Sequence, residues 1–115
     1  IPVACEIVSA IQTMVTRKVS VFDPAVITIA KIEAGTTNNI IPETANLLGT
    51  IRTLSPHRRA QVAEELNRLA PGIAAAHGCK AEVHIEQGFP VTLCDDRAVA
   101  FGKSVVEDVF GSDVF

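Results

Sequence analysis

The stretch GTTNNIIPETANLLGTIRTL, residues 35–54, decides the fold of this chain. Its first part is a polar turn, because Gly35 and the pair Asn38-Asn39 supply the positive-φ and side-chain-capped conformations that a tight connection needs. Pro42 cannot donate a hydrogen bond to a sheet, so it should lie at the mouth of a strand. From Thr44 onward the residues alternate in character, which is typical of a β-strand with two unlike faces.

The alternation assigns a face to each residue of this strand. One face is the candidate core face and carries Ala45, Leu47, Gly49 and Ile51. The opposite face is more polar and carries Asn46, Leu48, Thr50 and Arg52. Arg52 is therefore expected to point away from the core.

Two elements are predicted before this stretch. Apolar residues at three- and four-residue steps predict a helix over residues 2–18. Residues 25–34, AVITIAKIEA, are rich in β-branched side chains and predict a strand. In simple alternation Lys31 and Glu33 share the face of Ile29, a mixture that fits an edge strand or an edge covered by a partner.

Three elements are predicted after it. Ser55 caps a second helix, Pro71-Gly72 is expected to kink or break it, and Gly78 ends it in a left-handed conformation. Residues 81–87 alternate again and predict a third strand. Residues 95–109 show looser helical spacing and predict a third helix.

This order of elements predicts an α+β chain with a ferredoxin-like antiparallel sheet and two helices on one face. Such a sheet begins with a strand before the first helix, and we expect that strand to be lacking here. We expect residues 1–93 to form one domain fragment cut from a longer polypeptide, with residues 94–115 as a linker and a C-terminal helix. The C-terminal tail, a partner's strand or rearranged pairing can each fill the place of the missing strand.

Composition excludes several classes of function. The 115 residues carry a formal net charge of -3 with no basic stripe, which argues against a nucleic-acid surface. No apolar run reaches the roughly 18 residues that a membrane span needs, and no basic leader precedes the first helix. The three cysteines, an odd number without CxxC spacing, predict free thiols, buried or half-buried, in a reducing compartment such as the cytoplasm.

One pattern suggests a metal site. Glu82, His84 and Glu86 place three ligand types on one strand face, but neighbouring side chains on that face are about 7 Å apart and do not converge on one ion. A solvated strand face is the preferred interpretation. His57 and His77, near helix ends, are interpreted as solvated or capping residues.

Residues 39–53, NIIPETANLLGTIRT, resemble the N-V-I-P…G-T-x-R-T signature of the dimerisation (lid) domain in two-metal amidohydrolases and aminopeptidases, such as hippurate hydrolase and N-acyl-amino-acid amidohydrolases. The similarity covers residues 1–96. Shorter segments around the signature also match: Ala4-Cys5-Glu6-Ile7-Val8, Thr16-Arg17-Lys18-Val19, Asp23-Pro24-Ala25-Val26, Ala76-His77-Gly78 and Gly88-Phe89-Pro90-Val91-Thr92.

The resemblance implies a lid inserted into a catalytic domain that holds two divalent metal ions, usually zinc, and a glutamate general base. It implies a homodimer through the edge strand 25–34 and the helix 2–18, with a small-molecule substrate, no nucleic acid and no membrane. The chain itself is expected to hold no metal and to be inactive alone. Asn39 and Arg52 match the family residues associated with substrate carboxylate or oxyanion binding.

Alternatives remain open at this point. From the residues alone, Asn39 can simply satisfy its turn and Arg52 can be a surface charge on a strand. A second class of function is a small-molecule-binding regulatory module with a ferredoxin-like fold. A nucleic-acid-binding module is least favoured, because the polar strand faces offer no aromatic stacking platform.

Overall fold

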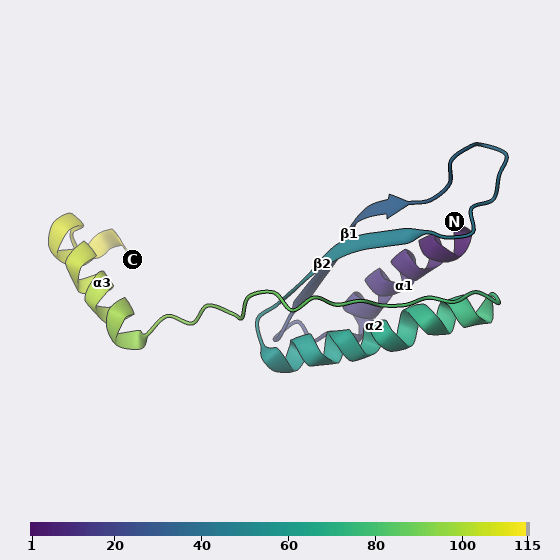
Figure 1. Ribbon diagram of the computed structural model, residues 1–115. Helices are drawn as coiled ribbons and strands as arrows, with labels where there is room; N and C mark the ends of the chain where they lie inside the picture. The colour runs from purple at the N-terminus through teal and green to yellow at the C-terminus, as the bar shows by residue number, and fades with distance from the viewer. Residues whose placement is uncertain (115) are drawn as a thin grey trace.

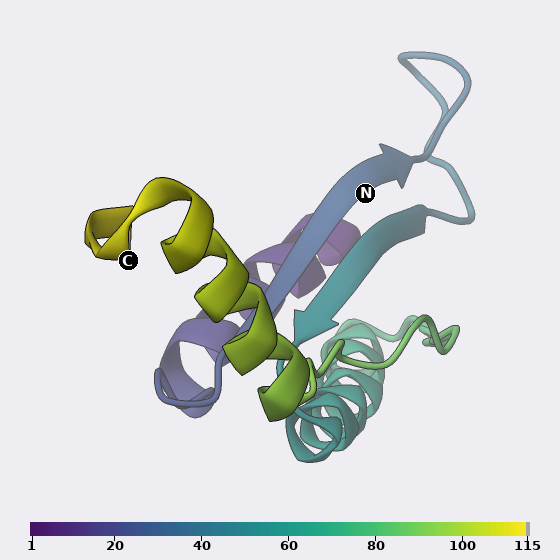
Figure 2. The same cartoon turned by 90° about the vertical axis from the view of Figure 1, so that its left-hand side faces the viewer.

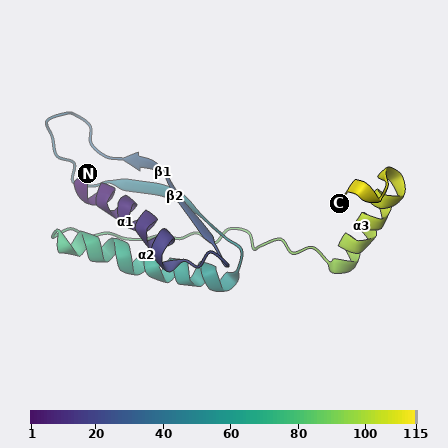
Figure 3. The same cartoon turned by 180° about the vertical axis from the view of Figure 1, so that it is seen from behind.

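Two long helices lie under a pair of antiparallel strands in the computed structural model, which describes residues 1–114 (Figure 1). In chain order the elements are α1 (Pro2–Lys18), β1 (Ala25–Glu33), β2 (Asn46–Thr53) and α2 (Pro56–Ala76). The view from behind confirms that both helices cover the same face of the strands (Figure 3). The α+β class and the two helices on one face are therefore as predicted. Phe115, the last residue of the predicted C-terminal segment, lies outside the described residues.

The core forms between the helices and one face of the strands. The stripe predicted on the first helix is buried, and Met14 belongs to it. Val62 of α2 is the most enclosed large side chain, with 1% of its surface exposed. The buried cluster is aliphatic and consists of Ile7, Ile11, Met14, Ala25, Ile27, Val62, Leu66 and Ala70.

The ends of α2 are capped as the sequence predicts, but its interior is not interrupted. The Ser55 hydroxyl accepts a hydrogen bond from the Arg58 backbone N–H at 3.0 Å, and Gly78 has a φ of +69°. The predicted break at Pro71-Gly72 is wrong, because one helix runs from Pro56 to Ala76. Proline removes only the bond to the Asn67 carbonyl, and Asn67 is exposed, so water can satisfy that oxygen.

Ser55 also joins α2 to the preceding turn. Its hydroxyl donates to Asp23 Oδ2 at 2.9 Å, and that carboxylate lies 3.4 Å from Nε of the buried Arg58.

We expect Ser55→Ala to lower the free energy of unfolding by about 1–2 kcal/mol, since the helix cap and the link to Asp23 are lost together. Urea titration followed by circular dichroism measures the effect. Ser104→Ala, in the C-terminal helix α3 (Asp96–Phe110), is the matched control and should change stability by less than about 0.5 kcal/mol. Equal effects of the two substitutions would contradict the capping role.

The two strands pair antiparallel with one irregularity. Ile27 pairs with Ile51 and Ile29 with Gly49, but Lys31 pairs with Leu48, so Ala30 is an extra residue on β1. A bulge of this kind reverses the alternation beyond it. The prediction that Lys31 and Glu33 share the face of Ile29 is therefore wrong. They lie on the open face with Val26 and Thr28, where Lys31 Nζ contacts Glu33 Oε1 at 2.6 Å.

Gly49 lies opposite this bulge, where the two backbones approach closely. A Cβ atom at Gly49 would lie 2.3 Å from the Thr28 carbonyl oxygen and 3.2 Å from the Ile29 Cα. Since those atoms belong to the backbone, they cannot move aside as a side chain can. Glycine is therefore required here by space.

The predicted third strand is extended but unpaired. Ala81, Val83 and Ile85 pack against the core cluster, and the residues between them are exposed, so the predicted alternation is correct. The sheet nevertheless contains only β1 and β2. Among residues 1–114, the segment 81–87 forms no backbone hydrogen bond, and β2 has a strand partner on one edge only.

The strand that the predicted sheet has before its first helix would lie between the 81–87 segment and β2. The 81–87 segment and β2 run in the same direction over the helices, so one strand running the opposite way between them would pair antiparallel with both. In residues 1–114 neither the C-terminal segment nor rearranged pairing fills that position. Arg59 fixes the chain just after this segment, because its guanidinium donates a hydrogen bond to the Phe89 carbonyl at 2.9 Å.

The C-terminal elements lie apart from the helix–strand layers. An extended connection leads to α3 (Asp96–Phe110) (Figure 1), and the 3₁₀ turn η1 (Ser112–Val114) follows that helix, which faces the viewer in Figure 2. The α3 helix is capped by Asp95 and ends at Gly111, and none of its residues is buried. Its bounds agree with the predicted helix within one residue, while the division into domains at residue 93 stays a prediction.

Two surface properties complete the fold. All three cysteines are free, but Cys5, Cys79 and Cys94 are exposed, so their predicted burial is wrong. They occupy helix-surface and connecting positions that the packed stripes do not include. Within residues 1–114, no helix is both long and apolar enough to span a membrane.

Candidate functional site

Arg52 stands on the open face of the strand pair. Its side chain is exposed and points away from the helices, as the alternation predicts. Its cross-strand neighbour is Val26, which is 57% exposed. Among residues 1–114, no acidic side chain pairs with the Arg52 guanidinium, so all of its donors are available to a carboxylate from outside.

Asn39 lies in the loop of residues 34–45 that joins the strands. Its side chain is exposed, and its Oδ1 accepts a hydrogen bond from the Thr37 hydroxyl at 3.2 Å. The Asn39 side chain therefore stabilises its own turn, which is the role that the residues alone suggest. It also fixes the orientation of the amide, so that the NH₂ group is left to donate.

The structure does not bring these two residues together within one chain. Arg52 is near the end of β2 that leads to α2, while Asn39 lies in the loop beyond the other end. The strand residues from Asn46 to Arg52 alone extend roughly 20 Å at about 3.3 Å per residue. A single small molecule therefore cannot contact both side chains of one copy.

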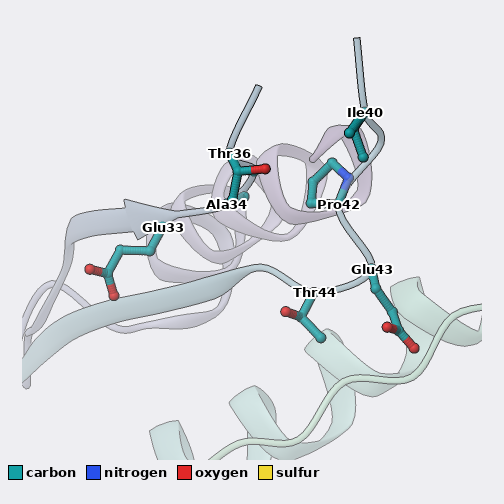
Figure 4. Close-up of a pocket in the computed structure, with 8 residues that line it drawn as sticks. Glu33, Ala34, Thr36, Ile40, Pro42, Glu43 and Thr44 are labelled. Atoms are coloured by element: carbon teal, nitrogen blue, oxygen red, sulfur yellow. The ribbon is translucent and has the colours of Figure 1, made fainter. Parts of the chain in front are cut away.

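The base of the same loop forms an open cavity of about 350 Å³ (Figure 4). The carboxylates of Glu33 and Glu43 stand on either side of it. The cavity includes neither Asn39 nor Arg52. Its full lining is Glu33, Ala34, Gly35, Thr36, Ile40, Pro42, Glu43 and Thr44.

The strand-face metal pattern is solvent-exposed. His84 Nε2 and Glu86 Oε1 are 3.8 Å apart, and both side chains are almost fully exposed. Over residues 1–114, no group of three or more His, Cys, Asp and Glu residues is arranged to hold a metal ion.

Charged contacts on α1 are directed toward α2. Glu6 Oε2 lies 2.7 Å from His77 Nε2, so His77 contacts a carboxylate at the helix ends. Lys18 Nζ lies 2.7 Å from Glu65 Oε1, and Arg68 contacts the other oxygen at 2.6 Å. The hydrogen bond from Lys18, followed by that from Arg68, lowers the pKa of Glu65. Sequence periodicity did not reveal these contacts, because they depend on how the helices cross.

This geometry defines an α+β module whose two strands each have a free outer edge, with an unpaired arginine on the open face and no metal cluster among the described residues. The chain belongs to the peptidase dimerisation domain family, whose profile matches residues 1–78. A solved structure of a Bacillus subtilis dinuclear metal-binding peptidase of the M20 family superposes with a TM-score of 0.76 at 30% identity, covering 95% of this chain and 27% of that one.

Curated relatives are hydrolases. A hydrolase of Sinorhizobium fredii is 37% identical over 98% of this chain and 28% of its own length. An N-acetyldiaminopimelate deacetylase of Priestia megaterium is 44% identical over 70% of this chain and 21% of its own length. An N-acetylcysteine deacetylase of Bacillus subtilis is 42% identical over 71% of this chain and 22% of its own length. The chain thus spans between 21 and 28% of the length of these relatives.

Proposed function

We propose that this chain is the dimerisation and lid domain of a larger cytoplasmic hydrolase that cleaves the amide bond of N-acyl amino acids or small peptides. The observation that carries the proposal is the family match over residues 1–78, together with relatives named as deacetylases. Two divalent metal ions, which we propose to be zinc, would supply the hydrolytic chemistry from the catalytic domain. Residues 94–115 would lead back to that domain.

The proposed dimer forms through strand 25–34 and helix 2–18. Within residues 1–114, the outer edge of β1 has no strand partner, and an unpaired edge readily pairs with another strand. The first helix lies beneath that edge, where Gln12 Nε2 donates to the Ile27 carbonyl at 3.1 Å. Strand and helix therefore offer one continuous surface to a second copy.

Arg52 and Asn39 are proposed to bind substrate in the assembled enzyme. An unpaired guanidinium can bind a carboxylate through two parallel hydrogen bonds, which suits the free carboxylate of an N-acyl amino acid. The Asn39 amide can donate to an oxyanion. Because the two lie at opposite ends of the strand pair, we assign them separate contacts.

The first test is self-association and activity of the chain itself. Sedimentation equilibrium should give twice the 12.2 kDa mass of one chain at high concentration. Ser9→Lys, on the side of α1 next to β1, should shift the equilibrium toward monomer because it places a charge in the proposed interface. The matched control is Asn67→Lys on the exposed side of α2, which should leave association unchanged.

The same protein should not hydrolyse N-acetyl amino acids, with or without added zinc, because the catalytic groups are proposed to reside elsewhere. A chain that stays monomeric at all concentrations would contradict the dimerisation role. Hydrolysis by the purified chain would contradict its role as a lid.

A further inference from the structure

A groove of about 320 Å³ lies between α1 and α2, and we call it the interhelix groove. Its floor is aliphatic and is formed by Ala10 and Met14 of α1 and by Leu69 of α2. Both helices lie under the strands, whereas Arg52 points away from the helices (Figure 3). The interhelix groove and the open strand face are therefore different surfaces of the molecule.

Three cations line the interhelix groove. Arg17 and Lys18 come from the last turn of α1, and Arg68 comes from α2. The carboxylate of Glu65 contacts Lys18 Nζ at 2.7 Å through one oxygen and an Arg68 guanidinium nitrogen at 2.6 Å through the other. Glu65 thus offsets one of the three positive charges, and no acidic residue in the described part of the chain lines the groove itself.

Arg17 is the cation of this groove that has no partner. Its side chain is exposed, and over residues 1–114 no ion pair or hydrogen bond occupies its guanidinium. A basic residue in the last turn of a helix interacts favourably with the helix dipole, which by itself accounts for a cation at this position. The dipole does not account for the aliphatic floor beside the free guanidinium.

We propose that the interhelix groove binds a small aliphatic carboxylate, with the carboxylate on Arg17 and the hydrocarbon chain along the aliphatic floor. Sites for small ligands are mostly apolar, contain a few polar groups that fix the orientation, and have volumes from about 300 Å³ upward. A guanidinium binds a carboxylate through two parallel hydrogen bonds. The neighbouring cations of one sign raise the local concentration of anions.

The two parts of the groove together select this class of ligand. A purely polar anion would leave the aliphatic floor in contact with water, and an uncharged hydrocarbon would leave Arg17 without a partner. The methylene stems of Lys18 and Arg68 extend the apolar wall below their charged groups. The flexible side chain of Met14 can adapt to hydrocarbon chains of different shape.

The methyl group of Met14 provides a direct measurement. Met14 is the one methionine of the chain, so isotope labelling of methionine methyl groups gives a single NMR signal from the groove floor. Titration of the chain with hexanoate should move this signal along a saturable curve.

Two other ligands separate the contributions of charge and chain. Acetate keeps the carboxylate but lacks most of the hydrocarbon, so it should bind at least about tenfold more weakly than hexanoate. Hexanamide keeps the chain without the charge and should also bind at least about tenfold more weakly, because it cannot form charge-assisted hydrogen bonds with Arg17. Equal affinity for hexanoate and hexanamide would overturn the inference.

Substitution of the free arginine is the second measurement. Arg17→Ala should weaken hexanoate binding at least about tenfold, because hydrogen bonds to a charged group are lost. Arg97→Ala is the matched control, since it removes an exposed arginine from α3 and should leave the affinity unchanged. Circular dichroism of both variants checks that the helices are retained.

Arg52→Ala tests the competing location. Hexanoate binding that is lost in Arg52→Ala but kept in Arg17→Ala would place the carboxylate on the open strand face and overturn the inference. A Met14 signal that does not move at any hexanoate concentration would overturn it as well. Neither result concerns hydrolysis or self-association, so the proposed function would stand or fall separately.

Discussion

Gly49→Ala should destabilise the chain by about 2–4 kcal/mol, near the upper end of what one added methyl group does. The new Cβ atom would lie 2.3 Å from the Thr28 carbonyl oxygen, well inside van der Waals contact. Relief requires the two strands to separate at the bulge. That separation would displace Ile27 and Ile51, which face the core from either strand.

Urea denaturation followed by far-ultraviolet circular dichroism measures the loss. Gly72→Ala is the matched control, because it adds the same methyl group in α2, where nothing lies within 4 Å of the new atom. Alanine is a better helix former than glycine by about 1 kcal/mol, so Gly72→Ala should stabilise the chain. Effects of the same sign at both positions would contradict the proposed steric cause at Gly49.

The sequence predicts features that follow from local periodicity. The apolar stripe of the first helix, the Ser55 and Gly78 caps and the two faces of residues 46–52 all appear as expected. Each depends on residues within a few positions of one another, where backbone geometry alone relates spacing to direction. The outward direction of Arg52 belongs to this group.

Features that depend on contacts distant in sequence were missed. The bulge at Ala30 depends on the close approach of Gly49, which alternation within β1 cannot reveal. The 81–87 segment has the alternation of a strand, yet pairing depends on a neighbour, and residues 1–114 provide none. The uninterrupted passage of α2 through Pro71 depends on the exposure of Asn67, which is a property of the packed helix.

The same distinction between local periodicity and distant contacts applies to the candidate site. Exposure of Asn39 and Arg52 follows from a turn and from strand parity. Their separation follows from the register and length of the strand pair, which the signature over residues 39–53 does not contain. The lack of an acidic neighbour around Arg52 is likewise a result of which residues lie across the strand, with Val26 directly opposite.

Arg52→Ala, introduced in the complete hydrolase that we propose, should raise KM for substrates with a free carboxylate by about 10- to 100-fold while kcat changes little. A hydrogen bond to a charged group contributes about 1.5–3 kcal/mol, which corresponds to this change in KM. The bond would be lost equally from the bound substrate and from the transition state, so kcat should change little. Folding stability should change by less than about 0.5 kcal/mol, because Arg52 is exposed and unpaired among residues 1–114. Arg52→Lys should give an intermediate KM, since lysine keeps the charge but loses the bidentate geometry.

Two comparisons separate carboxylate binding from a general loss of positive charge. Arg17→Ala removes an exposed arginine on the side of α1 toward α2 and should leave KM unchanged. Replacing the substrate carboxylate with a neutral amide should raise KM for the unmodified enzyme. With this amide substrate, the unmodified enzyme and Arg52→Ala should have the same KM, because the same interaction cannot be lost twice. If Arg52→Ala weakens the acid and the amide substrate by the same factor, Arg52 acts on the structure of the open strand face and does not bind the carboxylate.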